Sequence, residues 1–421
     1  MFFKNLSAGS TLSKLRRAVT LSPPARNEIM SLMREVASDI VDEAESMSLS
    51  GDLWETFLAL RLAQDDNALG RAAELSSVPA GSVVGLALSE LWSLHKIVGA
   101  ARTIVDNSAE LDGLRLLKNY EPALKRAFPP NPALGSVSKL AEAFAESLTP
   151  GEMMSALLGF YTSCGSGMFS LHKAFLWLPE TGLMPVKDPD PQSFAALLGY
   201  DDQKAELLAN TKLFLSGQAA NNVLLYGDSG TGKSSSVKAL MNEPDFIASG
   251  LRMIEVGKEQ ISEIPEIMRI IGCRNYRFIL FLDDLSFEDY EVGYKHLKAL
   301  IEGGVERKPE NVVIYATSNR RNIVREVWKD RKASSDDVHG WDTMQERLSL
   351  SDRFGITIWY GSLDKERYLE IVRFFADEYG ISIAQEELER LAMRWEIGRG
   401  GFSGRTARQF VQHLLIGVKR L

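Results

Sequence analysis

Apolar residues follow two different periods along the chain, and the change between them falls near residue 187. From Pro24 to about Glu180, Ala, Leu and Met recur at spacings of three and four, as in the run Leu53–Leu62. This period places apolar side chains along one face of a helix, so we expect an almost entirely helical region. The next run, 187–191, holds two X-Pro steps that disfavour helix, which indicates a linker.

Beyond the linker, short apolar runs alternate with helical ones. Helices that fit between strands are typical of a mostly parallel sheet covered on both faces. From Asp364 to Leu421 the pattern is helical again. We therefore expect an all-α N-terminal region in 1–186, an α/β domain in 187–362 and a helical domain in 363–421. The predicted strands are Val223–Tyr226, Leu251–Val256, Phe278–Leu282, Val312–Ala316 and Gly355–Trp359.

Composition narrows the class of protein. With 45% hydrophobic and 25% charged residues, the 421-residue chain resembles an ordinary soluble protein of two or three domains. No apolar run is long enough to cross a bilayer, and Cys164 and Cys273 cannot form a disulfide framework or a zinc site by themselves. We therefore expect no membrane association and a cytoplasmic location, although the acid-free start 1–27 is also typical of a mitochondrial presequence.

The run from Tyr226 to Ser235 contains a complete G-x-x-x-x-G-K-[ST] element. An apolar strand precedes it and a helix-forming run follows it, and this context separates a phosphate-binding loop from a chance match. Small residues let successive backbone N–H groups turn inward around phosphates. We expect ATP to bind at the residues of this loop, which are Gly227, Asp228, Ser229, Gly230, Thr231, Gly232, Lys233, Ser234 and Ser235. Lys233 is expected to reach the β- and γ-phosphates, and the Ser234 hydroxyl to bind Mg²⁺.

Polar residues end two of the predicted strands. Asp283 and Asp284 follow Phe278–Leu282, and Asn319 follows the next strand. The carboxyl end of a parallel strand is where an α/β sheet places its ligands. We expect Asp283 to hold Mg²⁺ through water, Asp284 to orient the attacking water and Asn319 to bind the γ-phosphate or that water. Acidic residues at the end of a strand are common on protein surfaces. Their position about fifty residues after the phosphate loop is what favours a role in binding magnesium and water.

The ordered motifs resemble those of AAA+ ATPases, and most closely those of a bacterial family of uncharacterised, predicted AAA+ ATP-binding proteins. The likeness is dense from about residue 158 to 412. It rests on Tyr161–Gly167, Leu198–Lys204, Ala220–Gly227, Phe281–Glu288, Ala316–Arg321, Leu348–Gly355 and Gly401–Phe410.

This resemblance implies a P-loop sheet with a C-terminal helical lid, in subunits that form a ring or spiral. It also implies that Arg353 is an arginine finger for the adjacent subunit and that Arg405 senses the phosphates of its own subunit. Leu198 and Gly199 would line the adenine pocket. The family has Asp284 where the wider superfamily has Glu. A side chain that is one methylene shorter leaves three alternatives: altered geometry, help from Glu288, or slow hydrolysis.

The leading functional hypothesis is an oligomeric ATPase that uses ATP and Mg²⁺ to remodel a macromolecular partner. The net charge of −8 favours a protein over DNA as that partner. Alternatives are a nucleotide-dependent switch or scaffold with slow hydrolysis, a DNA-associated loader and a phosphotransferase. Tyr290 and Tyr294 are candidates for contact with a client, with helix packing as the simpler interpretation.

Overall fold

A computed structural model describes residues 2–3, 11–76, 78–123, 132–286, 292–302, 308–319, 353–399 and 401–418. The chain divides into two compact units, Met1–His172 and Lys173–Leu421. This division precedes the boundary predicted at residue 186, and the boundary predicted at 362 lies inside the second unit. Each unit is described by itself below.

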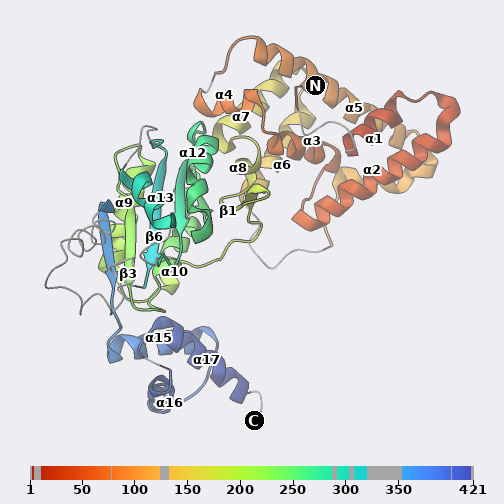
Figure 1. The fold of residues 1–421 in the computed structure, drawn as a ribbon. Helices are drawn as coiled ribbons and strands as arrows, with labels where there is room; N and C mark the ends of the chain where they lie inside the picture. Colours follow the sequence, from red (N-terminus) through yellow and green to blue (C-terminus); the bar gives the residue numbers. More distant parts are fainter. Residues whose placement is uncertain are drawn as a thin grey trace. The chain divides into compact units, whose positions relative to one another are not determined.

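The first unit is helical in its described residues, as the spacing of apolar residues predicts (Figure 1). On the long second helix, Met33, Val36, Ile40 and Ala44 recur at spacings of three and four, and all are buried. This stripe packs with apolar residues of the other helices into one core. The elements are α1 (Thr11–Thr20), η2 (Pro23–Ala25), α2 (Arg26–Met47), α3 (Leu53–Gln64), α4 (Ala68–Leu75), α5 (Ser82–Asp106), η3 (Ala109–Asn119), α6 (Pro132–Glu146), α7 (Pro150–Cys164) and α8 (Met168–Leu171).

By length and composition alone, helix α5 is long and apolar enough to cross a membrane, which corrects the expectation that no apolar run has this length. Its Leu91, Leu94 and Val98 are nevertheless fully buried in the core of the first unit. Near its end, Arg102 donates to Asp52 at the start of α3, at 2.6 Å between Nη2 and Oδ2. Helix α5 is therefore tied into the helical bundle by apolar packing and by an ion pair.

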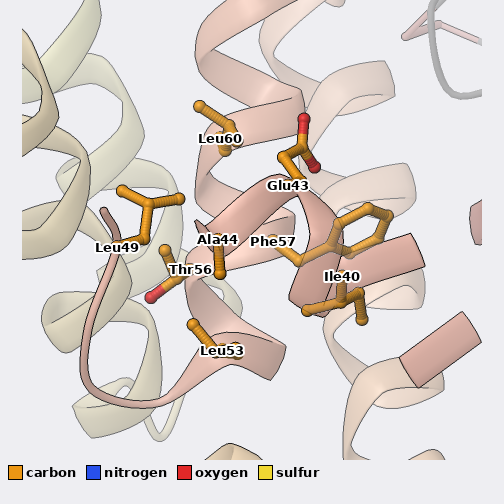
Figure 2. A pocket seen from close by; sticks show the side chains of 8 residues that line it. All are labelled: Ile40, Glu43, Ala44, Leu49, Leu53, Thr56, Phe57 and Leu60. Atoms are coloured by element: carbon orange, nitrogen blue, oxygen red, sulfur yellow. The ribbon is translucent and has the colours of Figure 1, made fainter. Parts of the chain in front are cut away.

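A pocket lies between α2 and α3 in this unit, and Figure 2 shows the side chains that line it. Most of them are apolar, with Thr56 and Glu43 as the polar members. Its volume is about 10 Å³, which is the space of a single water molecule. This pocket is too small for a cofactor or substrate.

The second unit is built on a seven-stranded sheet with the order β2-β1-β4-β5-β6-β3-β7 (Figure 1). Only β1 and β2 pair antiparallel; every other neighbouring pair is parallel. All five predicted strands are present, so this part of the fold prediction is confirmed. The strands are β1 (Ala174–Leu178), β2 (Gly182–Pro185), β3 (Val223–Gly227), β4 (Leu251–Glu255), β5 (Arg277–Leu282), β6 (Val312–Ser318) and β7 (Ile356–Tyr360).

Strands β1 and β2 correct the helical expectation for the end of the N-terminal region. Every residue of Ala174–Leu178 is apolar, so the sequence shows no period by which a strand could be distinguished from a buried helix. In the structure, Phe175 and Trp177 are buried whereas Leu176 and Leu178 are about 40% exposed, which is the alternation of a strand at a sheet. The hairpin extends the parallel sheet beyond β4.

Helices cover the sheet and form a separate cluster at the C-terminus. Helices α9, α10 and α11 bury Leu207, Phe214, Val237 and Phe246 against one face of the sheet. The last three helices enclose a small apolar core of their own. The predicted fold class, an α/β P-loop sheet followed by a helical domain, is confirmed. The helices are η4 (Phe194–Ala196), α9 (Asp201–Leu215), α10 (Lys233–Ala239), η5 (Leu240–Asn242), α11 (Pro244–Ala248), η6 (Lys258–Glu263), α12 (Ile264–Gly272), α13 (Val292–Glu302), α15 (Lys365–Glu378), α16 (Gln385–Ile397) and α17 (Gly404–Val418).

Candidate functional site

The G-x-x-x-x-G-K-[ST] loop connects β3 to α10, at the carboxyl edge of the sheet. Gly227, Gly230 and Gly232 have φ angles of 139°, 80° and 96°, a region that side chains disfavour. A Cβ atom on Gly227 would lie 1.9 Å from the carbonyl oxygen of Tyr360, the last residue of β7. The amide of Asp228 donates to that same oxygen at 3.1 Å. Glycine is therefore required where the loop crosses the end of β7.

Lys233 lies under the loop and is only 6% exposed. Its Nζ donates to the carbonyl oxygens of Gly227 at 2.9 Å and Asp228 at 2.6 Å, and to Asn319 Oδ1 at 3.2 Å. Burial lowers the pKa of this ammonium group, while the charges of Asp228, Asp284 and Asp283 oppose that shift. Because its hydrogen-bond partners are all neutral oxygens, Lys233 is well placed to exchange one of them for a phosphate oxygen.

Asp283 and Asp284 follow β5 and are held by two different sets of bonds. Asp283 Oδ1 accepts from Ser234 Oγ and from Thr317 Oγ1, each at 2.6 Å. Asp284 Oδ1 accepts from Asn319 Nδ2 at 2.6 Å. Since Asn319 also accepts from Lys233, one chain of bonds joins the lysine of the loop to the second carboxylate. Residues expected in one site from three separate motifs thus touch one another.

The oxygen atoms at this point fit a magnesium ion. A serine hydroxyl and a carboxylate, Ser234 and Asp283, lie within hydrogen-bond distance of each other. The hydroxyl donates a hydrogen bond to the carboxylate, so its oxygen lone pairs remain available for a cation. Mg²⁺ prefers such oxygen ligands and takes the remainder from phosphates and water. In the described ranges, no three His, Cys, Asp or Glu side chains form a metal-binding group, so a metal with several protein nitrogen or sulfur ligands has no matching site there.

The C-terminal helices contact the loop at two places. Arg405, at the start of α17, makes two of these contacts. Its backbone amide donates to Gly230 O at 3.3 Å, and its guanidinium Nη1 donates to Ser229 Oγ at 3.3 Å. In the segment that leads into α15, the Ser362 hydroxyl donates to an Asp228 carboxylate oxygen. Arg405 was expected near the phosphates, and the structure brings its guanidinium to the phosphate loop.

The predicted adenine wall needs a finer description. Leu198 packs against the core of the C-terminal helices, and Gly199 adopts a φ of 78° beside Leu363. The neighbour of Leu198 points at the loop instead: a Cβ on Gly232 would lie 3.7 Å from Leu197 Cδ2. Leu197, which the sequence motifs did not indicate, is therefore the leucine whose side chain lies next to the loop.

Arg353 is not brought to its own loop. It precedes β7, which runs parallel to β3 with Val223 opposite Ile356 and Gly227 opposite Tyr360. The loop follows the carboxyl end of β3, and Arg353 lies beyond the amino end of β7. The strand from Ile356 to Tyr360 alone spans about 13 Å, so Arg353 and the loop lie at opposite edges of the sheet.

A family model described as "Protein of unknown function (DUF815)" matches residues 170–417, which is more than half of the chain. The chain belongs to this DUF815 family. The matched range begins just before β1 and ends within α17, so it contains the whole sheet, the loop and the C-terminal helices. No curated protein matches the sequence.

Among solved structures, the DUF815 chain is similar to the Thermotoga maritima RuvB Holliday junction branch migration motor. The identity is 17% and the TM-score 0.38, over 54% of this chain and 67% of the RuvB chain. A point variant of the same RuvB gives 17% identity and a TM-score of 0.38 over 54% and 68%. A likeness of this size carries no argument about activity, which has to come from the site itself.

The described residues that touch the site without having been predicted as site residues include Leu197, Thr317, Tyr360 and Ser362. Thr317 lies within the motif 316–321, but its contacts, like those of the other three, follow only from the packing of strands and loops. Glu288 and Tyr290 lie outside the described residues, as does the side chain of Tyr294. Their predicted roles stay predictions.

Proposed function

We propose that this DUF815 protein is an AAA+ ATPase that binds MgATP at the carboxyl edge of its sheet and hydrolyses it to drive or gate the remodelling of a macromolecular partner. The observation that carries the proposal is the bonded group of Lys233, Asn319, Asp284, Asp283 and Ser234 beneath the glycine loop. These residues come from three separate stretches of the sequence. Their convergence supplies a phosphate-binding cation, oxygen ligands for magnesium and a carboxylate.

In this mechanism the residues of the chain mainly position ATP and the attacking water and neutralise the charge of the phosphates. The loop amides and Lys233 bind the β- and γ-phosphates; Ser234 and Asp283 would hold Mg²⁺, which would supply positive charge to offset that of the phosphate oxygens. Asp284 accepts a hydrogen bond from the attacking water and orients it toward the γ-phosphorus. Asn319, which lies between Lys233 and Asp284, donates its amide to that water or to the γ-phosphate. Leu197, Leu198 and Gly199 contact the base, and Arg405 binds the phosphates from the C-terminal helices.

The first test is calorimetry of the purified full-length chain with ATP, with and without Mg²⁺, followed by assay of phosphate release. The variant Lys233→Ala is expected to lose binding, because Lys233 is the buried cation of the loop. Lys173→Ala is a matched control: burial lowers the pKa of Lys173 as it does that of Lys233, and its Nζ donates to Met241 O at 2.6 Å and Asn242 Oδ1 at 2.9 Å, outside the loop. A wild-type chain without affinity for ATP would refute the proposal.

The second part of the proposal is that sites are shared between subunits of a homo-oligomer. Arg353 lies at the sheet edge opposite its own loop, so a role in catalysis requires the loop of another copy. An arginine supplied in this way accelerates related reactions by roughly 10³–10⁵. Arg353→Ala and Lys233→Ala chains are each expected to be inactive, and their mixture to regain activity. Absence of recovery at every mixing ratio would argue against shared sites.

A nucleotide-gated switch with slow hydrolysis is the second candidate. It is supported by Asp284, whose carboxylate is already bound by Asn319 at 2.6 Å and whose side chain is one methylene shorter than glutamate. A burst of one turnover followed by much slower steady-state release of products would favour the switch. We propose a cytoplasmic protein that acts on a protein client rather than on DNA, in line with the net charge of −8. Capture of partners on Asp284→Asn with ATP tests the class of client.

A further inference from the structure

Thr317 connects β6 to the turn that carries the two carboxylates. It is the sixth residue of Val312–Ser318 and only 1% exposed. Its Oγ1 donates to Asp283 Oδ1 at 2.6 Å and accepts from the Asp284 amide at 2.8 Å. Its carbonyl oxygen accepts from the amide of Leu285 at 2.7 Å. A single threonine therefore bonds to each residue of the Asp-Asp-Leu turn.

The turn needs such support because Asp284 has a φ of 51°. Residues other than glycine are uncommon in this left-handed region, and they persist there when surrounding contacts hold them. The amide of Asp284 has two acceptors: Asp283 Oδ1 at 3.1 Å and Thr317 Oγ1 at 2.8 Å. The threonine oxygen is the closer acceptor, and it is fixed by the strand behind it.

The Thr317 hydroxyl also selects which oxygen of Asp283 is available. Ser234, Thr317 and the Asp284 amide all donate to Oδ1. Within the described part of the chain, no hydrogen bond to the other oxygen of Asp283, Oδ2, is found. With Oδ1 held by three donors, the carboxylate has a fixed rotation, and Oδ2 is the oxygen left for a cation or its water.

We propose that Thr317 is a positioning residue that sets both carboxylates, Asp283 for the metal and Asp284 for water. The inference rests on the proposed function and goes beyond it, since Thr317 itself touches neither nucleotide nor metal. Only a hydroxyl can donate to one group and accept from the other in the same place. Loss of a residue that orients a metal ligand typically costs 10–100-fold in metal affinity or activity.

The test compares Thr317→Val, which keeps the shape and removes the hydroxyl, with Thr317→Ser, which keeps it. Two quantities are measured on the full-length chain: the Mg²⁺ concentration for half-maximal ATP hydrolysis, and binding of a fluorescent ATP analogue in EDTA. Thr317→Val is expected to raise the first by about 10–100-fold and to leave the second within about twofold, because the loop and Lys233 are untouched. Thr317→Ser is expected to stay close to wild type.

The matched control is Thr211→Val. Thr211 is a fully buried threonine of α9 whose hydroxyl donates to Leu207 O at 2.8 Å and meets the Tyr315 hydroxyl at 2.9 Å, away from both carboxylates. Thr211→Val removes a buried hydroxyl from the same unit of the chain as Thr317→Val does. It is expected to lower stability without changing the Mg²⁺ concentration needed for half-maximal hydrolysis. If Thr317→Val does not fold, the same two quantities are measured on Thr317→Ala, which also lacks the hydroxyl but has a smaller side chain.

The outcomes separate the two proposals. A wild-type chain without Mg²⁺-dependent nucleotide binding would refute the proposed function, and the role of Thr317 with it. An active wild type with an unchanged Mg²⁺ requirement in Thr317→Val would refute the role of Thr317 alone. Equal loss in Thr317→Ser, or equal loss of analogue binding in EDTA, would also refute it, because neither follows from a hydroxyl that orients carboxylates.

Discussion

Replacement of Asp284 by asparagine separates binding from turnover more sharply than any other change in this chain. Asparagine has the same shape, and its side-chain oxygen can still accept from Asn319 Nδ2, now at 2.6 Å from Asp284 Oδ1. Asparagine also tolerates a φ of 51° better than most residues. The turn, the loop and the ATP affinity are therefore expected to survive, and only the negative charge is lost.

The size of the effect follows from what that charge does in the proposed mechanism. A carboxylate that orients and polarises the attacking water, as a general base does, contributes roughly 10²–10⁴-fold to the rate. This factor corresponds to about 3–5 kcal/mol in the activation free energy. We expect Asp284→Asn to lower the single-turnover rate of ATP hydrolysis by this factor and to change the dissociation constant for ATP by less than about threefold.

The assay is phosphate release from pre-bound ATP in a single turnover, beside calorimetry of ATP binding. Asp202→Asn is the matched control, since Asp202 is an exposed acid at the start of α9 and its replacement removes the same charge from the same unit. Undiminished hydrolysis in Asp284→Asn would remove its proposed role. Loss of ATP binding together with hydrolysis would contradict the argument that the substitution preserves the turn.

Three further changes test other parts of the structure. Gly227→Ala is expected to weaken ATP binding at least tenfold in calorimetry, because the new Cβ would lie 1.9 Å from Tyr360 O; Gly85→Ala, where nothing lies within 4 Å, is its control and should bind normally. Arg405→Ala removes a guanidinium from the loop and is expected to weaken ATP binding by about 10–100-fold, the value of a charge-assisted hydrogen bond. Its control, Arg394→Ala, removes an exposed arginine of α16 and should leave ATP binding unchanged. Equal ATP affinities of the two variants would argue against a phosphate role for Arg405. Burial raises the pKa of Glu43 above its ordinary 4.5, against the opposing effect of Arg61. The folded chain therefore holds this proton more tightly, and the resulting stabilisation is present below pH 4.5 and lost as pH rises through the raised pKa. Thermal unfolding of the full chain between pH 4 and 7 should show this dependence in wild type and not in Glu43→Gln, and an unchanged dependence would contradict the assignment to Glu43.

The strands around the site could be predicted because their sequences contain their own boundaries. The run Phe278–Leu282 is apolar and ends in two acids, and the loop after β3 has fixed glycines. Strand β1 could not be predicted, since five apolar residues carry no period and its parallel pairing with β4 joins segments that are distant in the sequence. The family resemblance pointed to Leu198 at the adenine pocket, whereas the structure places Leu197 Cδ2 within 3.7 Å of a Cβ built on Gly232. This placement depends on how the segment packs against the loop, which the sequence does not specify.

Thr317 shows a second kind of limit. The residues around Thr317 form the motif from which Asn319 was predicted. The function we propose for Thr317, however, depends on Asp283, which follows a different strand, β5. Strands β5 and β6 are adjacent and parallel, with Leu282 opposite Ala316. This register places Asp283 beside Thr317. The contact follows from the register, which no single stretch of sequence specifies.

Strand β7 joins the two halves of the proposed shared site. At its carboxyl end, Tyr360 accepts the Asp228 amide and limits Gly227 to glycine, so the position of the loop depends on this strand. Arg353 precedes its amino end, at the edge of the sheet opposite that loop. The strand is short and is paired with β3 along its whole length, from Val223 to Gly227. If Arg353 serves an adjacent copy, as we propose, a displacement of β7 on ATP binding would link the two proposed sites through one strand. Under that proposal, coordination between subunits would need no separate signalling segment.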